Sequence, residues 1–132
     1  MASRHFTVEE AQGLVGWLEE TFQALTPLCQ RLSELNDEIR ESENIILSNG
    51  GGAVDERLET HRHDLDKTSR LIKERIQAIH ERGILVKSIQ GGLVDFPSIR
   101  ERREMYLCWQ AGEREIQFWH EMDIGFVGRQ PI

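Results

Sequence analysis

The sequence predicts an α+β protein in which a long antiparallel two-helix hairpin precedes a small antiparallel sheet of about three strands. Three observations favour this class. Apolar residues recur in steps of three and four from Val8 to Arg82, they alternate in steps of two after Gly83, and a run of glycines at Gly50–Gly52 breaks the helical pattern once. We expect a single domain over residues 1–132, with the hairpin at about 8–82 and the sheet and tail at about 84–132.

Composition excludes several classes of protein. The chain has 132 residues, 39% of them hydrophobic and 30% charged, which is typical of a globular protein. Its net charge of −7 argues against nucleic acid, which is bound through clustered basic residues. It has no apolar run of membrane-spanning length, and acidic residues interrupt the first apolar segment. Cys29 and Cys108 are too few and too far apart for a disulfide framework. We expect a cytoplasmic protein that binds neither nucleic acid nor membrane.

The first helix is predicted to begin at about residue 8, because Thr7 and Glu10 have the spacing of a capping box. A heptad seam follows, in which every residue except Asn36 is apolar. Additional leucines next to the seam indicate that this helix contacts more than one neighbour. Pro27 favours a kinked continuous helix, with a new start at Thr26 as the alternative. The seam positions are Val8, Ala11, Val15, Leu18, Phe22, Leu25, Cys29, Leu32, Asn36, Ile39 and Ile46.

The second helix is expected from about Asp55 to Arg82, after a loop at Ser48–Gly52, with Gly83 as its C-cap. Its apolar seam is Leu58, Leu65, Ile72 and Ile79, supported by Val54, and the positions between hold the polar residues His61, Thr68 and Arg75. Antiparallel folding places Asn36 near His61, a polar layer that could fix register. Because two helices cannot bury stripes this wide, we predict a homodimer formed through the hairpin.

Three strands are predicted at Gly92–Pro97, Glu104–Gln110 and Glu115–Met122, and Ile84–Ile89 is either a fourth strand or an extended connection. If the last two strands pair through a loop with an even number of residues, one shared apolar face results and packs against the hairpin. His120 then lies at its far end, near Arg103 or Met105. The residues of this expected face are Met105, Leu107, Trp109, Ile116, Phe118, His120 and Met122.

The C-terminal segment holds the candidate site residues. His120, Glu121 and Asp95 are candidate catalytic groups, since a histidine with nearby carboxylates can act as a base or bind a metal ion. His120 and Glu121 point to opposite faces of a strand, so one site uses only one of them. The favoured interpretation is structural, with His120 hydrogen-bonded to Asp95 or Glu104. Ligand-binding residues there would be Arg103, Arg129, Trp109 and Gln130, whereas Cys108, with no histidine at a matched position, is expected to be a packed residue.

The two ends of the chain carry a family resemblance. "RHFTVEEAQGLVGWL" and the segment from Gly91 to Pro131, with its blocks "LVDFP", "YLCW", "GE", "FWHE" and "GFVGRQP", resemble an uncharacterised bacterial family catalogued as domain of unknown function number 2203. The resemblance implies a compact cytosolic protein and no particular activity. It marks the positions Asp95, Trp109, Glu113, His120, Glu121, Gly128, Arg129 and Gln130 as a shared pocket or a shared requirement of the fold.

Two functions follow from these patterns. The first is a dimeric interaction or scaffold protein built on the helical hairpin, favoured by the polar seam and the absence of a recognisable catalytic set. The alternative is a small-ligand or metal-binding protein, or an enzyme, with a pocket between the sheet and the helices centred on His120. A divalent metal at His120 belongs to this alternative and is not the favoured interpretation.

Overall fold

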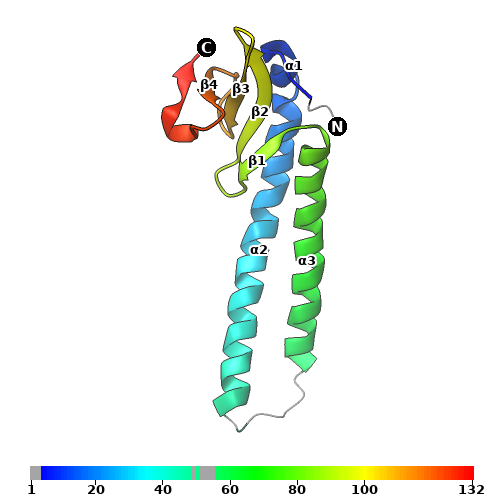
Figure 1. The fold of residues 1–132 in the computed structure, drawn as a ribbon. Coiled ribbons are helices and arrows are strands. Elements are labelled where there is room, and N and C mark those ends of the chain that lie inside the picture. Colours follow the sequence, from blue (N-terminus) through cyan, green and yellow to red (C-terminus); the bar gives the residue numbers. More distant parts are fainter. Residues whose placement is uncertain (1–3, 49, 51–55) are drawn as a thin grey trace. The chain divides into compact units, whose positions relative to one another are not determined.

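The computed structural model describes residues 4–48, 50 and 56–132, and this part of the chain is α+β. Its helices are α1 (Val8–Gln12), α2 (Val15–Ser48) and α3 (Glu56–Glu81), and an antiparallel sheet follows them (Figure 1). The chain forms two compact units. The sheet unit takes the chain up to Ala24 and from Arg75 onward, and the hairpin unit is Leu25–Glu74. No helix among the described residues is both long enough and apolar enough to cross a membrane.

The start of α1 confirms the predicted capping box. Thr7 accepts a hydrogen bond from the Glu10 amide at 3.1 Å, and the Glu10 carboxylate accepts one from the Thr7 amide at 3.0 Å. The helix predicted to run on from there is interrupted, because Gly13 and Leu14 form a turn between α1 and α2. The Leu14 amide bonds to the Ala11 carbonyl, three residues back instead of four, which tightens the backbone locally.

The hairpin unit contains most of α2, which continues through Pro27 as the favoured interpretation expected. Leu25 of the predicted seam is buried, but further along the helix Leu35 is fully buried and Asn36 is exposed, so the prediction of Asn36 in the seam was wrong. Burying a leucine removes more apolar surface from water than burying an asparagine, so Leu35 takes the buried position.

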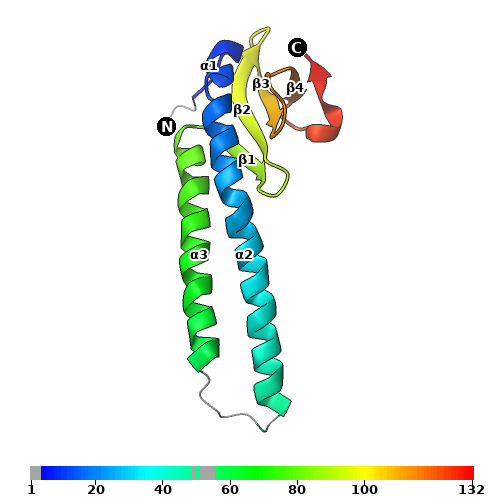
Figure 2. The ribbon, with the colours of Figure 1, turned by 180° about the vertical axis from the view of Figure 1, so that it is seen from behind.

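A polar layer does lie between the two helices of the hairpin unit, which run side by side and antiparallel in Figures 1 and 2. Half-buried His61 lies 3.1 Å from Glu38, the partner that replaces the expected Asn36. Arg31 and Asp64 are 4.0 Å apart. The predicted loop at Ser48–Gly52 is only partly described, and Val54 and the predicted helix start at Asp55 lie outside the described residues.

Gly83 ends α3 as predicted, with a left-handed φ of 88° and its amide bonded to the His80 carbonyl. The sheet has five strands in sequence order, more than the three expected. The uncertain candidate at Ile84–Ile89 is a strand, and the last strand is too short for an alternating pattern to reveal it. The strands are β1 (Leu85–Ser88), β2 (Leu93–Arg100), β3 (Arg103–Gln110), β4 (Phe118–Glu121) and β5 (Gln130–Pro131).

A two-residue turn sets the register of β2 and β3. Glu101 and Arg102 both have positive φ, 51° and 65°, which is the type I′ geometry that matches the twist of paired strands. The pairing then places Asp95 directly opposite Cys108. Sequence reasoning did not find this turn, because it lacks the usual asparagine and glycine.

One face of the sheet packs on the helical part of the same unit. Phe96 contacts Phe6 with ring centroids 5.2 Å apart, and Trp109 lies 6.3 Å from Phe22 in the first turns of α2. Leu107 between them is also buried. Figure 2 shows α1 and the start of α2 beside β2. Trp109, a member of the expected apolar face, thus packs on the first turns of α2.

The predicted register of β3 and β4 was wrong by one residue. Leu107 is paired with Trp119 and Tyr106 with His120, so His120 lies on the face opposite Leu107. In the connection between β3 and β4, Ile116 is buried in the core, and its amide donates a hydrogen bond to the Gln12 side-chain oxygen at 2.7 Å. Since Ile116 is buried outside the strand, β4 is free to take the other register.

Candidate functional site beneath the C-terminal tail

The second face of the sheet brings together one side chain from each of three adjacent strands. Asp95 comes from β2, Cys108 from β3 and His120 from β4. Their carboxylate oxygen, thiol sulfur and ring nitrogen all lie within 4.8 Å of one another. The exposed fractions of the three residues are 2%, 1% and 3%. We call these residues the buried cluster.

The two ring nitrogens of His120 face two different oxygen atoms. Nδ1 lies 2.9 Å from the Glu121 carbonyl oxygen, which can only accept, so Nδ1 carries a hydrogen. Nε2 lies 2.9 Å from Asp95 Oδ1. In a neutral ring Nε2 would present a lone pair to a carboxylate, which is repulsive. A cation, either a proton or a metal ion, therefore belongs between His120 and Asp95.

The thiol of Cys108 is the least ionisable member of the cluster in the protein alone. Burial raises its pKa from 9.0 to about 11, and the negative charge of Asp95 acts in the same direction. The Asp95 carboxylate also accepts a hydrogen bond from the thiol. With its proton in place, Cys108 is not a nucleophile at neutral pH.

The C-terminal tail covers this face of the sheet. The short 3₁₀ helix η1 (Phe126–Gly128) is followed by Arg129, whose guanidinium carbon lies 4.1 Å from the ring centre of Phe118 and 4.6 Å from that of Phe126. Arg129 Nη2 also donates to the Glu113 carboxylate at 2.7 Å and to the Cys108 carbonyl at 3.3 Å. Arg129 is thus the anchor that holds the tail on the buried cluster.

A small cavity of about 230 Å³ remains between the tail and the sheet. Asp95 and His120 line it, so the cluster faces this space. Tyr106, whose ring centre is 5.5 Å from that of His120, forms one wall. The remaining lining residues are Lys87, Leu93, Met122, Asp123, Ile124, Gly125 and Phe126.

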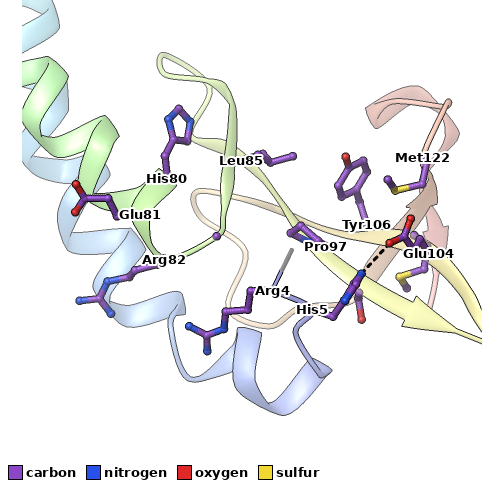
Figure 3. Close-up of a pocket in the computed structure, with 13 residues that line it drawn as sticks. Arg4, His5, His80, Glu81, Arg82, Leu85, Pro97, Glu104, Tyr106 and Met122 are labelled. Carbon is purple, nitrogen blue, oxygen red and sulfur yellow. Dashed lines mark hydrogen bonds and ion pairs between the residues drawn. The ribbon is translucent and has the colours of Figure 1, made fainter. Parts of the chain in front are cut away.

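A larger pocket of about 540 Å³ shares Tyr106 and Met122 with that cavity (Figure 3). Several of the charged side chains that line this pocket already contact neighbouring residues. His5 lies 3.0 Å from Glu104, and the guanidinium of Arg82 stacks 3.9 Å from the ring centre of Trp17. His80 accepts a hydrogen bond from the Val86 amide at 3.3 Å. This pocket is larger, but it lacks a buried cluster of metal-binding side chains.

The structure separates the residues predicted from sequence into two groups. His120 and Asp95 lie beneath the tail, Arg129 of the tail donates to the Cys108 carbonyl, and the expected His120–Asp95 hydrogen bond is present. The others lie elsewhere. Glu121 faces away from His120 and lies 3.8 Å from exposed Arg103. His120, expected near Arg103 or Met105, is paired with Tyr106, so Glu121 is the residue opposite Met105. Trp109 is buried on the opposite face, and Gln130 is exposed on the edge strand β5.

Sequence reasoning missed Cys108 as a site residue, and it marked Glu113 only through the family resemblance. Cys108 was expected to have no histidine nearby, but the corrected register puts His120 on its face. The two-residue Glu101-Arg102 turn accounts for Asp95 opposite Cys108, whereas the approach of His120 depends on the register of β4, for which the local sequence carries no signal. Glu113 orders the β3–β4 connection: its carboxylate accepts from the Gln110 amide at 2.7 Å, and its carbonyl accepts from the Trp109 indole at 2.8 Å.

Fold and site together define a small α+β protein with a buried cluster of carboxylate, thiol and imidazole on one face of its sheet. The model of the family DUF2203, described as an uncharacterized conserved protein, matches residues 4–132, and the chain belongs to this family. No curated protein and no solved structure shows significant similarity to the chain. The segments that supply Asp95, Cys108 and His120 all lie within the matched region.

Proposed function

We propose that the chain is a metal-binding protein and that Asp95, Cys108 and His120 hold one zinc ion. The observation that carries the proposal is the convergence of three different donor atoms within 4.8 Å at a place shielded from bulk water. Each of the three donor atoms lies within this distance of the other two. The described residues contain one such group.

The orientation of His120 supports a metal. Histidines that bind metals usually donate their second ring hydrogen to a carbonyl or carboxylate, which fixes the tautomer and aims the free lone pair at the ion. His120 makes this contact through Nδ1 to the Glu121 carbonyl, and its Nε2 points at the cluster. A zinc ion would supply the positive charge that the facing lone pair and carboxylate need.

The donor set fits zinc better than magnesium or calcium, which prefer oxygen alone. Zinc lies about 2.0–2.3 Å from nitrogen, oxygen and sulfur ligands, so tetrahedral ligands are separated by about 3.3–3.8 Å. These separations are within the 4.8 Å that bounds the cluster. His120 and Asp95, now 2.9 Å apart, would move apart by a few tenths of an ångström. Zinc would displace the Cys108 proton, which makes binding weaker in acid.

Competition against a chromophoric zinc chelator tests the assignment. The substitution Cys108→Ser should weaken zinc binding by a factor of about ten or more, because a thiolate is replaced by a poor zinc ligand. Cys29→Ser is the matched control, since Cys29 is outside the cluster, and it should leave the affinity unchanged. Equal affinities for wild type and Cys108→Ser would show that zinc, if bound at all, is held elsewhere.

We also propose that the hairpin unit mediates homodimerisation, in line with the heptad pattern. Three apolar side chains of the two helices remain exposed in the single chain: Ile45 at 55%, Leu47 at 72% and Leu71 at 40%. A second copy would cover them and extend the polar layer of His61 and Glu38, as in a four-helix bundle. This proposal is independent of the metal site.

A further inference from the structure

We infer that the zinc ion keeps one coordination position open toward the cavity beneath the tail, and that this position takes a small carboxylate. The inference rests on the proposed metal site and adds a ligand class to it. Structural zinc sites have four protein ligands, whereas sites that bind substrates have three and an open position. The cluster offers three, so the fourth position must be filled by something other than these side chains.

The cavity lies where that fourth ligand would enter. Asp95 and His120 line the cavity but Cys108 does not, so the open side of the cluster is the one facing the tail. Its volume of about 230 Å³ corresponds to roughly eight water molecules at about 30 Å³ each. A short-chain carboxylate such as butyrate, which has three carbon atoms beyond its carboxylate, is small enough to enter it.

The walls suit a ligand with a short apolar chain, and the metal ion itself would attract its carboxylate. Leu93, Ile124 and Phe126 supply apolar surface. Lys87 supplies a cation, with its ammonium 5.6 Å from the centre of the Tyr106 ring, which is tilted against the His120 ring. Asp123, which is exposed, contributes a negative charge to the lining of the same cavity. Lys87 and Asp123 should therefore change carboxylate affinity in opposite directions.

The larger pocket in Figure 3 is a weaker candidate for this ligand. Arg4 and Arg82 stand at the end of that pocket away from Met122, where Arg4 lies 3.8 Å from Glu10 and 4.3 Å from the ring centre of Phe6. Glu81 and Glu104 balance the two arginines. The charges of this pocket balance, and none of its lining residues belongs to the buried cluster, so it offers no metal ion to hold a carboxylate.

Cobalt substitution tests the open position directly. The Co²⁺-loaded full chain should show visible absorption that changes on addition of sodium butyrate or imidazole, because either can occupy a free coordination position. The substitution Lys87→Gln should weaken butyrate binding about threefold to tenfold, and Asp123→Asn should strengthen it, by the loss of one charge contact each. Imidazole is neutral, so its affinity should not change in either variant.

The outcomes separate the two proposals. Absence of any cobalt spectrum would reject the metal site itself. A cobalt spectrum that neither butyrate nor imidazole alters would keep the metal site and reject the open position. A response to imidazole with equal butyrate affinity in wild type, Lys87→Gln and Asp123→Asn would reject the carboxylate. Lys73→Gln, which removes an exposed lysine of α3 outside the cavity, controls for net charge.

Discussion

Loss of the contact between Asp95 and His120 should lower the free energy of unfolding strongly. Both are buried, and each is the principal charged partner of the other. In metal-free protein, replacing His120 with Ala leaves the Asp95 carboxylate without its cation, which typically costs about 3–5 kcal/mol. Urea unfolding in the presence of a chelator measures this cost.

A double-mutant cycle separates the pair from simple loss of packing. Asp95→Asn combined with His120→Ala should be less destabilising than the sum of the single changes, because the uncompensated charge is removed. Strict additivity of the two free energies would show that the two groups do not depend on each other in the folded state.

Glu10 gives a pH dependence with a defined sign. The Thr7 backbone amide donates to its carboxylate, and this hydrogen bond, with a further one to the Thr7 side chain, lowers the pKa of Glu10 from 4.5. The folded state therefore holds this proton less tightly than the unfolded state. The stabilisation is present above pH 4.5 and is lost as the pH falls through the lowered pKa.

The variant Glu10→Gln keeps a hydrogen-bond acceptor but does not titrate. The difference in unfolding midpoint between wild type and Glu10→Gln should shrink between pH 7 and pH 3. If the difference stays constant over this range, the capping box does not depend on the charge of Glu10.

At the scale of elements, the tail depends on a glycine that admits no side chain. A Cβ on Gly128 would lie 2.0 Å from Cγ2 of Ile124, so Gly128→Ala must displace the Ile124 side chain or open the turn between the two residues. We expect a loss of about 1–3 kcal/mol from overpacking and a weaker Arg129 anchor. Gly125→Ala is the control in the same turn, because nothing lies within 4 Å of its Cβ. Similar melting temperatures for the two variants would contradict the proposed packing of the tail.

Two substitutions in the β2–β3 turn should increase the stability of the protein. Glu101 and Arg102 adopt positive φ, which costs energy for residues other than glycine and asparagine. The change Glu101→Asn with Arg102→Gly matches the type I′ turn and should stabilise the protein by about 0.5–1 kcal/mol. Thermal unfolding followed by circular dichroism would reveal the increase, and a lower melting temperature would mean that these side chains contribute contacts of their own.

The elements also show what the sequence could and could not predict. The capping box, the continuity of α2 through Pro27, the Gly83 cap and the β1 candidate follow from local chemistry, and they were found. The register of β4 was missed because it depends on Ile116 and Gln12, more than a hundred residues apart in sequence. His120 and Asp95 could be proposed as neighbours, whereas Cys108 could not be added until that register was known.

At the scale of the whole molecule, two proposals can be tested separately. If the hairpin unit mediates dimerisation, light scattering after gel filtration should give twice the chain mass of 15.3 kDa at micromolar concentration. Leu71→Glu, at an exposed position of α3, should shift the mass toward one chain by burying a charge in the interface. A wild-type mass of one chain at this concentration would rule out the dimer and leave the metal site unaffected.

The metal content of the folded chain tests the central claim most directly. After metal removal, reloading with zinc and desalting, elemental analysis should give one zinc per chain for wild type. It should give a strongly reduced content for Asp95→Ala, in which one member of the buried cluster is missing. In folded wild-type protein, a content of less than about a tenth of a zinc ion per chain is too little for a site with the affinity of protein zinc sites. That result would contradict the metal site and show that a proton holds Asp95 and His120 together.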